Sequence, residues 1–594
     1  MVKKREIRLL LAVILILVCF ISALPSSFSG DTNSYQYSHH NIMSVPPSPI
    51  RQVAEFEPMQ ASLIRYNANS NSFGIPYQAI KEMAEDVTVI TIVANVNQQN
   101  TVLTNFQNQG VNIDNCEFLI APSNTHWTRD YGPWFVFTDD DELAVIDFTY
   151  SRDYPNRYHD DNINSVFSAD QDLPLYFMPL FHEGGNYMTD GQGIAISTDL
   201  VWDVNPGLSP SEIDDIVFDY LNVSSYHVVP DINGEYIRHV DCWGKYLAPD
   251  VIMIREVPSS HSQYTLIEEA VDYFESQINC YGTPYTVVRV YTPNNEPYTN
   301  SLILNNKVLV PLTGASYWDN LAIQSYQQAM PGYEILGFYG SWHSTDALHC
   351  RVMGIPDRYM LYLEHTPLSG YQSSDNGYEI QIKIQPYSGT NLIMPETGVY
   401  WRSDNFDWNF IPLSSVGCNF YRAVIPPQEN GTTISYYIQA RDASGRMENH
   451  PYIGEPGAHM FTAYGELNHP PEIPQRPWGP ATGEAGSTYR YSTSTIDIED
   501  DLVFYLWEWG DGTFSEWIGP YSSGETASTT HTWTEKGTFS IRVKACDIHG
   551  EESDWSEPFV VSMPKNQMPF LWRFEGLHRL ISRVLLAIEA LLSI

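Results

Sequence analysis

The chain has 594 residues, of which 43% are hydrophobic, so it has the length for about three or four domains with cores of their own. Its 71 acidic and 31 basic residues give a formal net charge of −40, and such a surface would repel nucleic acid, which excludes that class of partner. The same charge would attract cationic substrates, such as peptides that carry lysine or arginine.

The N-terminus has the pattern of a segment that directs export. Four basic residues lie within the first eight positions, and an apolar stretch interrupted only by Ser22 covers residues 9–24. We expect residues 1–24 to be a secretory signal peptide, or an uncleaved signal anchor, because the apolar stretch is slightly long. A leader rich in serine and proline would follow over residues 25–50. The protein is therefore expected to be secreted or associated with the cell surface.

Residues 51–370 have the pattern of an α/β domain. Apolar β-rich runs, such as "DVTVITIVANV" (86–96), alternate with helical stretches, such as "HSQYTLIEEAVDYFESQI" (261–278). This alternation of strands and helices is typical of the α/β class. The segment has no glycine pattern of a dinucleotide-binding or P-loop fold.

The following segments contain strands and turns only. Residues 371–463 hold about seven short predicted strands, which favours an immunoglobulin-like sandwich. A proline-rich linker over 464–480 precedes a second all-β segment, 481–563. Its "YLWEWGDGTFS" and "HTWTEKGTFSIRVKACD" resemble the PKD-type module of secreted proteins, and this resemblance implies a binding or spacing role for that segment.

The C-terminal segment, 569–594, predicts an amphipathic helix. Its apolar residues recur at i, i+3, i+4 and i+7, and charged residues lie between them. Those charges exclude a helix that spans a membrane. We expect the helix to lie in a membrane interface, to pack against a partner helix, or to dock onto its own chain.

Polar residues with catalytic potential stand inside apolar, aromatic segments. Asp130 lies in "NTHWTRDYGPWFVF", His239 and Asp241 in "YIRHVDCWGKYLAPD", Asn300 in "PYTNSLILNNKVLVP" and Cys350 in "STDALHCRVMGIP". If His239 and Asp241 lie on a strand, their i, i+2 spacing places both on one face. An imidazole and a carboxylate together with a distant cysteine form a candidate cysteine-nucleophile site. Zinc is the weaker alternative, because no pair has the local spacing of a structural zinc site.

Several separated segments resemble one family in the right order. "EFEP" (55–58), "TRDYGPW", "EGGN", "HVDCWGKYL" and "TDALHCR" are similar to the guanidine-modifying, or pentein, superfamily and its agmatine deiminase branch. The likeness is greatest to the bacterial peptidylarginine deiminases and covers roughly residues 50–463. It implies a five-bladed, pseudo-symmetric α/β propeller with the active site at its centre, followed by the immunoglobulin-like and PKD-like sandwiches.

The resemblance also implies the reaction, which is hydrolysis of peptidyl-arginine to peptidyl-citrulline and ammonia. Cys350 would attack the guanidinium carbon, and His239 would act as general acid and then as general base. Asp130 and Asp241 would each accept N–H donors of the planar guanidinium, and Asn300 would orient the site. No cofactor or catalytic metal is needed for this chemistry, and the sequence does not identify a structural cation.

Substrate class depends on the segment "FTYSRDYPNRYHDD" (148–161). It lies where the bacterial peptidyl enzymes use arginines to bind the C-terminal carboxylate of a peptide. Arg152 fits that role, Tyr154 stands at the second arginine position, and Arg157 could replace it; Trp127 is a further expected substrate contact. The expected partners are arginine-containing peptides or proteins. The alternatives are a deiminase of agmatine or free arginine, and a non-catalytic surface adhesin on a deiminase scaffold.

Overall fold

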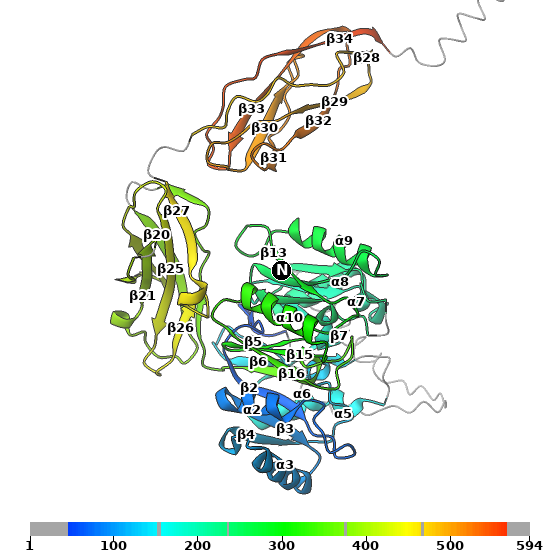
Figure 1. The fold of residues 1–594 in the computed structure, drawn as a ribbon, viewed down its shortest axis with the longest axis vertical. Helices are drawn as coiled ribbons and strands as arrows, with labels where there is room; N and C mark the ends of the chain where they lie inside the picture. Colours follow the sequence, from blue (N-terminus) through cyan, green and yellow to red (C-terminus); the bar gives the residue numbers. More distant parts are fainter. Residues whose placement is uncertain are drawn as a thin grey trace, which may run out of the picture. The chain divides into compact units, whose positions relative to one another are not determined.

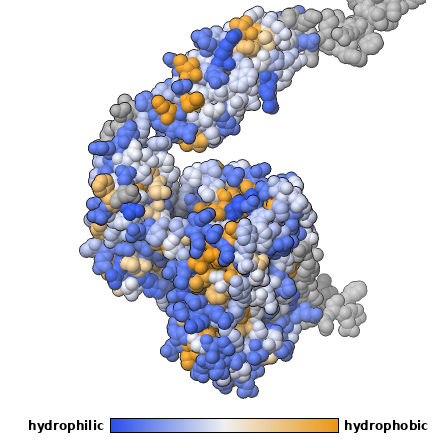
Figure 2. Space-filling view, viewed as in Figure 1, coloured by the Kyte–Doolittle hydropathy of each residue, from blue (hydrophilic) through white to orange (hydrophobic). Residues whose placement is uncertain are grey.

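The computed structural model describes residues 45–150, 156–234, 237–373, 377–404, 406–464 and 469–566 (Figure 1). The predicted signal peptide, Arg152, Tyr154 and the predicted tail helix lie outside these residues. Within the described ranges, no helix has both the length and the apolar character needed to cross a membrane. On the face seen in Figure 2, hydrophilic side chains cover most of the surface and hydrophobic ones form small patches.

The described part of residues 51–356 contains five separate sheets of three or four strands, so the predicted α/β class is confirmed. In pairing order the sheets are β1 (Arg51–Gln52), β5 (Trp134–Phe137), β6 (Leu143–Tyr150), β7 (Leu175–His182); β10 (Ser225–Val229), β9 (Ile194–Thr198), β8 (Met188–Thr189); β11 (Gly244–Ala248), β12 (Val251–Glu256), β13 (Thr286–Tyr291); β14 (Leu302–Leu304), β15 (Lys307–Leu312), β16 (Glu334–Tyr339); and β17 (Met353–Pro356), β2 (Met59–Arg65), β3 (Thr88–Val93), β4 (Cys116–Ile120).

One unit recurs in these sheets. An antiparallel pair of strands is followed by a helical connection to a parallel strand, as in β11, β12 and β13. In the last sheet the antiparallel pair joins β17 to β2, which lie far apart in the sequence. That pairing holds the segment before β17 against the start of the domain. Strands pair within a unit and not between units, so closure of the five units into a propeller stays a prediction.

The longer helices of this domain each bury one apolar face, whereas the short α4 (Thr128–Tyr131) is buried on all sides. The α-helices are α2 (Tyr77–Asp86), α3 (Val96–Gln109), α4 (Thr128–Tyr131), α5 (Tyr158–Asp161), α6 (Ile163–Gln171), α7 (Leu200–Val204), α8 (Pro210–Leu221), α9 (Tyr264–Glu275) and α10 (Ser316–Ala329). In α8, Ser209 and Glu212 form a capping box that fixes the first turn, and Ile213, Val217 and Leu221 are buried at i, i+4 and i+8. The predicted helical stretch 261–278 contains α9, and the predicted strand 86–96 contains β3.

Short 3₁₀ turns hold some of the polar residues singled out in the sequence, among them Asp241 and Cys350. They are η1 (Ile113–Asn115), η2 (Gly184–Asn186), η3 (Val240–Cys242), η4 (His349–Arg351), η5 (Met394–Glu396) and η6 (Glu455–Gly457). Three of them, η2, η3 and η4, follow or precede strands of different sheets, and η2 contacts both η3 and α4. These turns therefore bring side chains from distant parts of the sequence to one place.

Two all-β units follow, as expected. The first has β18 (Leu361–Glu364), β20 (Tyr378–Pro386), β24 (Phe420–Ile425) and β23 (Ser414–Gly417) in one sheet, and β19 (Tyr371–Ser373), β27 (His459–Tyr464), β25 (Thr433–Arg441), β21 (Gly398–Ser403) and β22 (Asn409–Pro412) in the other, with β26 (Met447–His450) on β25. This unit takes in β18, which precedes the expected start at residue 371. The buried residues of both sheets form one apolar core.

The second all-β unit is the PKD-like segment. Its strands are β28 (Thr482–Ala485), β34 (Phe559–Asn566), β33 (Gly537–Asp547), β30 (Val503–Glu508) and β31 (Ile518–Tyr521) in one sheet, and β29 (Thr488–Thr493) and β32 (Ala527–Thr532) in the other. Its core is aromatic: the rings of Trp507 and Trp509 are stacked, and Trp533 meets Trp509 edge to face. Such rings bury a large apolar area for a small unit.

Candidate active site

Cys350 lies in η4, directly before β17, and is 2% exposed. Asn300 fixes this turn through three contacts. Its Oδ1 accepts the backbone N–H of Cys350 at 3.3 Å, and its carbonyl oxygen accepts the backbone N–H of His349 at 3.1 Å. Its Nδ2 lies 3.2 Å from Cys350 Sγ and donates toward it. Asn300 thus positions the thiol and offers a hydrogen bond that would stabilise a thiolate.

His239 is fully buried between two carboxylates. Its Nε2 lies 2.6 Å from Glu183 Oε2, and its Nδ1 lies 3.6 Å from Asp130 Oδ1. Burial alone would lower the pKa of His239, but the charges of Asp130 and Glu183 and the hydrogen bond to Glu183 outweigh burial and raise that pKa to about 9. His239 is therefore an imidazolium at neutral pH. Its Nε2 is held by Glu183, and its Nδ1 faces the site.

The pKa of Asp130 is raised as well, but for a carboxyl this favours the neutral form. Burial is the main cause that raises the pKa of its carboxyl to about 8, and the charges of Glu183 and Asp241 add to it against that of His239. Two polar atoms here, Asp130 Oδ1 and His239 Nδ1, are buried and make no hydrogen bond to any described residue. Because buried polar atoms normally have hydrogen-bond partners, these two unpaired atoms indicate that the site receives a polar group of a ligand.

Asp241 is held ionised by its neighbours. Its Oδ2 lies 2.8 Å from His349 Nδ1 and 3.5 Å from Cys350 Sγ. Burial would raise the pKa of Asp241, but the hydrogen bond and charge of His349 outweigh burial and lower it. The other nitrogen of His349, Nε2, lies 2.6 Å from Glu55 Oε2. Both ring nitrogens of His349 therefore face carboxylate oxygens, to which each can donate a hydrogen bond.

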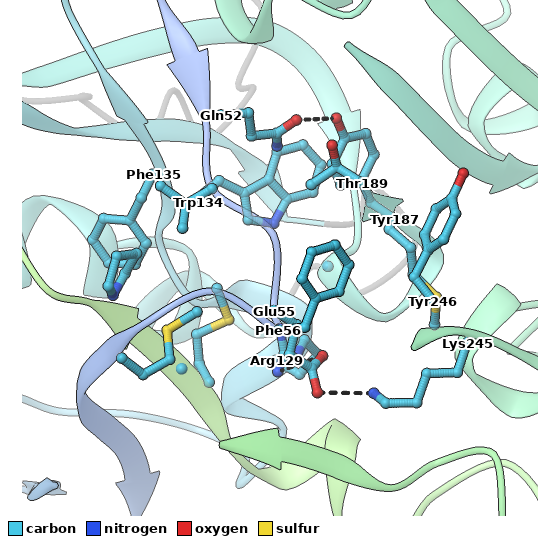
Figure 3. A pocket seen from close by; sticks show the side chains of 17 residues that line it. Gln52, Glu55, Phe56, Arg129, Trp134, Phe135, Tyr187, Thr189, Lys245 and Tyr246 are labelled. Carbon is cyan, nitrogen blue, oxygen red and sulfur yellow. Dashed lines mark hydrogen bonds and ion pairs between the residues drawn. The ribbon is translucent and has the colours of Figure 1, made fainter. Parts of the chain in front are cut away.

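The contacts that run from Asp241 through His349 continue to Glu55, which lies on the wall of a pocket. Figure 3 shows Glu55 beside Arg129 and Lys245 on the wall of that pocket. Lys245 Nζ lies 2.8 Å and Arg129 Nη2 3.3 Å from Glu55. Burial would raise the pKa of Glu55, but Lys245, His349 and Arg129 outweigh burial and hold it well below the ordinary range. Asp241, His349, Glu55 and Lys245 thus form a chain of alternating acidic and basic side chains behind Cys350.

Gly185 marks the point on which the polar groups converge. A Cβ added there would lie 2.5 Å from His239 Nδ1, 2.7 Å from Asp130 Oδ1 and 3.1 Å from Asp241 Oδ2. Any side chain would fill the space between these three atoms. Glycine is therefore required in the "EGG" turn, and the three atoms surround a small polar space, which we call the cradle.

The surroundings of Cys350, beside the cradle, favour its protonated thiol. Burial, followed by the charges of Asp241 and Asp130, raises the pKa of Cys350 well above its ordinary value. A cation in the cradle would neutralise both of those charges and lower the thiol pKa. The arrangement thus couples the nucleophile to the arrival of a positively charged ligand.

The structure brings the predicted residues together, but not as the sequence suggested. The expected strand with His239 and Asp241 on one face is wrong: His239 precedes η3 and Asp241 lies within it. A tight turn, rather than strand alternation, aims both side chains at one site. Glu183, Glu55 and His349 were not predicted as site residues, although "HEGGN", "EFEP" and "ALHC" contain them.

The predicted substrate contacts are only partly described. Arg152 and Tyr154 lie outside the described residues. The guanidinium carbon of Arg157 lies 4.7 Å from the ring centre of Trp127, and Arg157 Nη1 donates to the hydroxyl of Tyr150 at 2.7 Å. The carbonyl of Trp127 accepts the backbone N–H of Asp130 at 3.0 Å, so this cation–π pair lies one turn from the cradle.

Comparisons with known proteins agree with this geometry. A family model described as Porphyromonas-type peptidyl-arginine deiminase matches residues 51–356, which is more than half of the chain, and a PKD domain model matches residues 477–558. The agmatine deiminase of Medicago truncatula is 26% identical over 293 residues, which cover 40% of this chain and 77% of the relative.

Two solved structures are also similar. The agmatine deiminase of Enterococcus faecalis is 21% identical, with a TM-score of 0.47, and the match covers 52% of this chain and 96% of that one. The PKD domain of an M14-like peptidase from Thermoplasmatales archaeon SCGC AB-540-F20 is 48% identical, with a TM-score of 0.16, and the match covers 17% of this chain and all of that one.

Replacing Glu183 by glutamine should lower the pKa of His239. The substitution keeps the shape but removes the charge that holds Nε2, so the pKa should fall from about 9 toward the ordinary histidine value of about 6.5. Histidine-labelled protein titrated by NMR measures this. Glu117→Gln, at an exposed carboxylate, is the control that should leave the value unchanged. An unaltered His239 pKa in Glu183→Gln would contradict the assignment.

Proposed function

Because the chain belongs to the Porphyromonas-type peptidyl-arginine deiminase family, whose members are hydrolases of amidine C–N bonds, we propose that it converts arginine residues of peptides or proteins to citrulline and ammonia. Enzymes of this family are cysteine hydrolases that work without a cofactor. The observation that carries the proposal is the cradle formed by Asp130, His239 and Asp241 around Gly185, next to Cys350.

The cradle suits a guanidinium group. This cation is planar, stays protonated at any ordinary pH and carries several N–H donors in one plane. Asp130 and Asp241 can each accept a pair of these donors, and Gly185 leaves room for the flat group between them. The cation lowers the pKa of Asp130 again by its charge. Citrulline is neutral, so the product loses this attraction and leaves.

The bound cation also prepares the nucleophile. The thiol of Cys350 loses its proton to solvent as the positive charge enters, and the thiolate attacks the guanidinium carbon, which forms a C–S bond. His239 gives the proton on Nδ1 to the departing nitrogen, the C–N bond breaks, and ammonia leaves. His239 then takes a proton from water, whose oxygen attacks the same carbon. The C–S bond breaks, the hydroxyl group on the carbon gives its proton to solvent as the urea carbonyl of citrulline forms, and the thiolate is restored.

Arg157 supports a substrate that carries a carboxylate. Its guanidinium is held over the ring of Trp127 and against the hydroxyl of Tyr150, one turn from Asp130. We propose that it binds the C-terminal carboxylate of a peptide that ends in arginine. The competing proposal is a deiminase of agmatine, the substrate in the names of several relatives, or of free arginine. Agmatine has no carboxylate, which separates the two. A non-catalytic adhesin would have no need of the assembled cradle.

Several expectations about the rest of the chain remain proposals. The export pattern of residues 1–24 supports an enzyme that is secreted or held at the surface, where proteins are the available substrates. The amphipathic pattern of residues 569–594 supports contact with a membrane surface or a partner helix. We further propose that the five repeated units of residues 51–356 are the blades of a closed propeller around the cradle.

Ammonia release from a panel of substrates tests the proposed function. An arginine-ended peptide should give a higher kcat/KM than agmatine or free arginine, because it is the one with both a guanidinium and an extended peptide carboxylate to bind. All three are compared with the same enzyme preparation. Faster turnover of agmatine than of the peptide would refute the peptidyl assignment and favour the competing one.

Replacing Arg157 by alanine should lower kcat/KM for the arginine-ended peptide by about 10- to 100-fold, because a lost charge-assisted hydrogen bond costs about 1.5–3 kcal/mol. The same peptide with its C-terminus amidated is the internal control, and the substitution should change its turnover little. An equal loss on both peptides would show that Arg157 supports the fold near Trp127 and does not bind the carboxylate.

A further inference from the structure

A loop of the PKD domain gathers three carboxylates that play no part in the deiminase site. The loop connects β29 and β30 and contains Asp497, Glu499 and Asp501. One carboxylate oxygen from each residue lies within 4.8 Å of the other two. At this spacing the three oxygens can face a single ion.

The loop turns its acidic side chains inward and its apolar side chains outward. Asp497 is 2% and Glu499 8% exposed, whereas Ile496 and Ile498 are 56% and 75% exposed. Water favours the opposite arrangement, because burying an unpaired charge costs more than burying a hydrocarbon side chain gains. The inward carboxylates therefore need a compensating positive charge.

Hydrogen bonds inside the protein use only part of these carboxylates. Asp497 Oδ1 accepts the backbone N–H groups of Glu499 and Asp501 at 3.0 and 3.1 Å. Glu499 Oε1 accepts the hydroxyl of Tyr464 at 2.7 Å and lies 2.9 Å from His469 Nδ1. Asp497 Oδ2 and Glu499 Oε2 are buried, and no residue in the described ranges donates to them. Two buried acceptors thus remain for a ligand.

The nearby basic groups do not balance the charge. In the described parts of the chain, only histidines form ion pairs with these carboxylates: His469 with Glu499, and His549, at 3.5 Å, with Asp501.

We propose that this loop binds Ca²⁺, with Asp497, Glu499 and Asp501 as its carboxylate ligands. An all-oxygen set with no thiolate suits a hard cation rather than zinc. Calcium accepts about six to eight oxygens in flexible geometry, so backbone carbonyls and water can complete the shell, whereas Mg²⁺ demands near-ideal octahedral geometry. Through Glu499 the ion is tied to Tyr464 and His469, which precede the PKD domain in the chain.

Calorimetric titration of calcium chloride into the full chain, after chelation and gel filtration, tests this site. The wild type should bind one Ca²⁺ per chain, and should bind magnesium chloride more weakly. Asp497→Asn should weaken calcium binding at least about tenfold, because affinity in such sites follows the number of ligand charges. The matched control is Asp500→Asn, at an exposed aspartate of the same acidic run, which should keep wild-type affinity.

A second variant, Asp501→Asn, distinguishes the loss of a calcium ligand from misfolding. Asp501 is only half-buried, and its substitution leaves both hydrogen bonds to Asp497 Oδ1 in place. Calcium binding should weaken as in Asp497→Asn, while the circular dichroism spectrum stays that of the wild type. A wild-type protein that binds no calcium, or wild-type affinity in both variants, would overturn the proposal. Neither measurement uses the deiminase reaction, so the two proposals succeed or fail separately.

Discussion

Charge balance among buried groups is the constraint on which this site depends. Four carboxylates and four basic side chains share one buried region: Glu55, Asp130, Glu183 and Asp241 with Arg129, His239, Lys245 and His349. Removing one partner of a buried pair costs about 3–5 kcal/mol, because it leaves an uncompensated charge. The order of the contacts decides each protonation state. Glu55 and Asp241 face basic groups and stay ionised, whereas Asp130 also faces other carboxylates.

Recognition is linked to chemistry here, because the carboxylates that would bind a guanidinium group also act on the nucleophile. Burial, together with the charges of Asp241 and Asp130 that would attract a guanidinium, raises the pKa of the Cys350 thiol well above its ordinary value. A neutral ligand would balance neither of these carboxylate charges. In the acidic loop of the PKD domain buried carboxylates again need a positive charge. Among the described residues only histidines form ion pairs with them, and the proposed calcium ion would supply the rest.

The sequence predicted the classes of the domains and most of the catalytic groups for two different reasons. Strands such as β3 and helices such as α9 follow from local apolar periodicity, which the chain displays directly. Asp130, His239, Asp241, Asn300 and Cys350 came from a family resemblance, and the structure places them together. The turn at η3 was missed because strand alternation was assumed where tertiary packing bends the backbone.

Contacts between distant residues could not be predicted in this way. Glu55 and His349 stand 294 positions apart, and the pairing of β17 with β2 helps to bring their segments together. The role of Glu183 was within reach, because it lies in the "HEGGN" segment already singled out. The burial of Asp497 and Glu499 could not be predicted, because a run of acidic residues in a sequence is typical of a solvated loop.

The central claim is that Cys350 is the nucleophile of a guanidinium hydrolase, and ammonia release by a Cys350→Ala protein tests it most directly. With an arginine-ended peptide as substrate, turnover should fall by at least about a thousandfold, since the thiol that forms the covalent intermediate is removed. Cys116→Ala, at a partly buried cysteine whose thiol pKa is also raised, should keep wild-type turnover. Ammonia release by Cys350→Ala at a rate near that of the wild type would contradict the account.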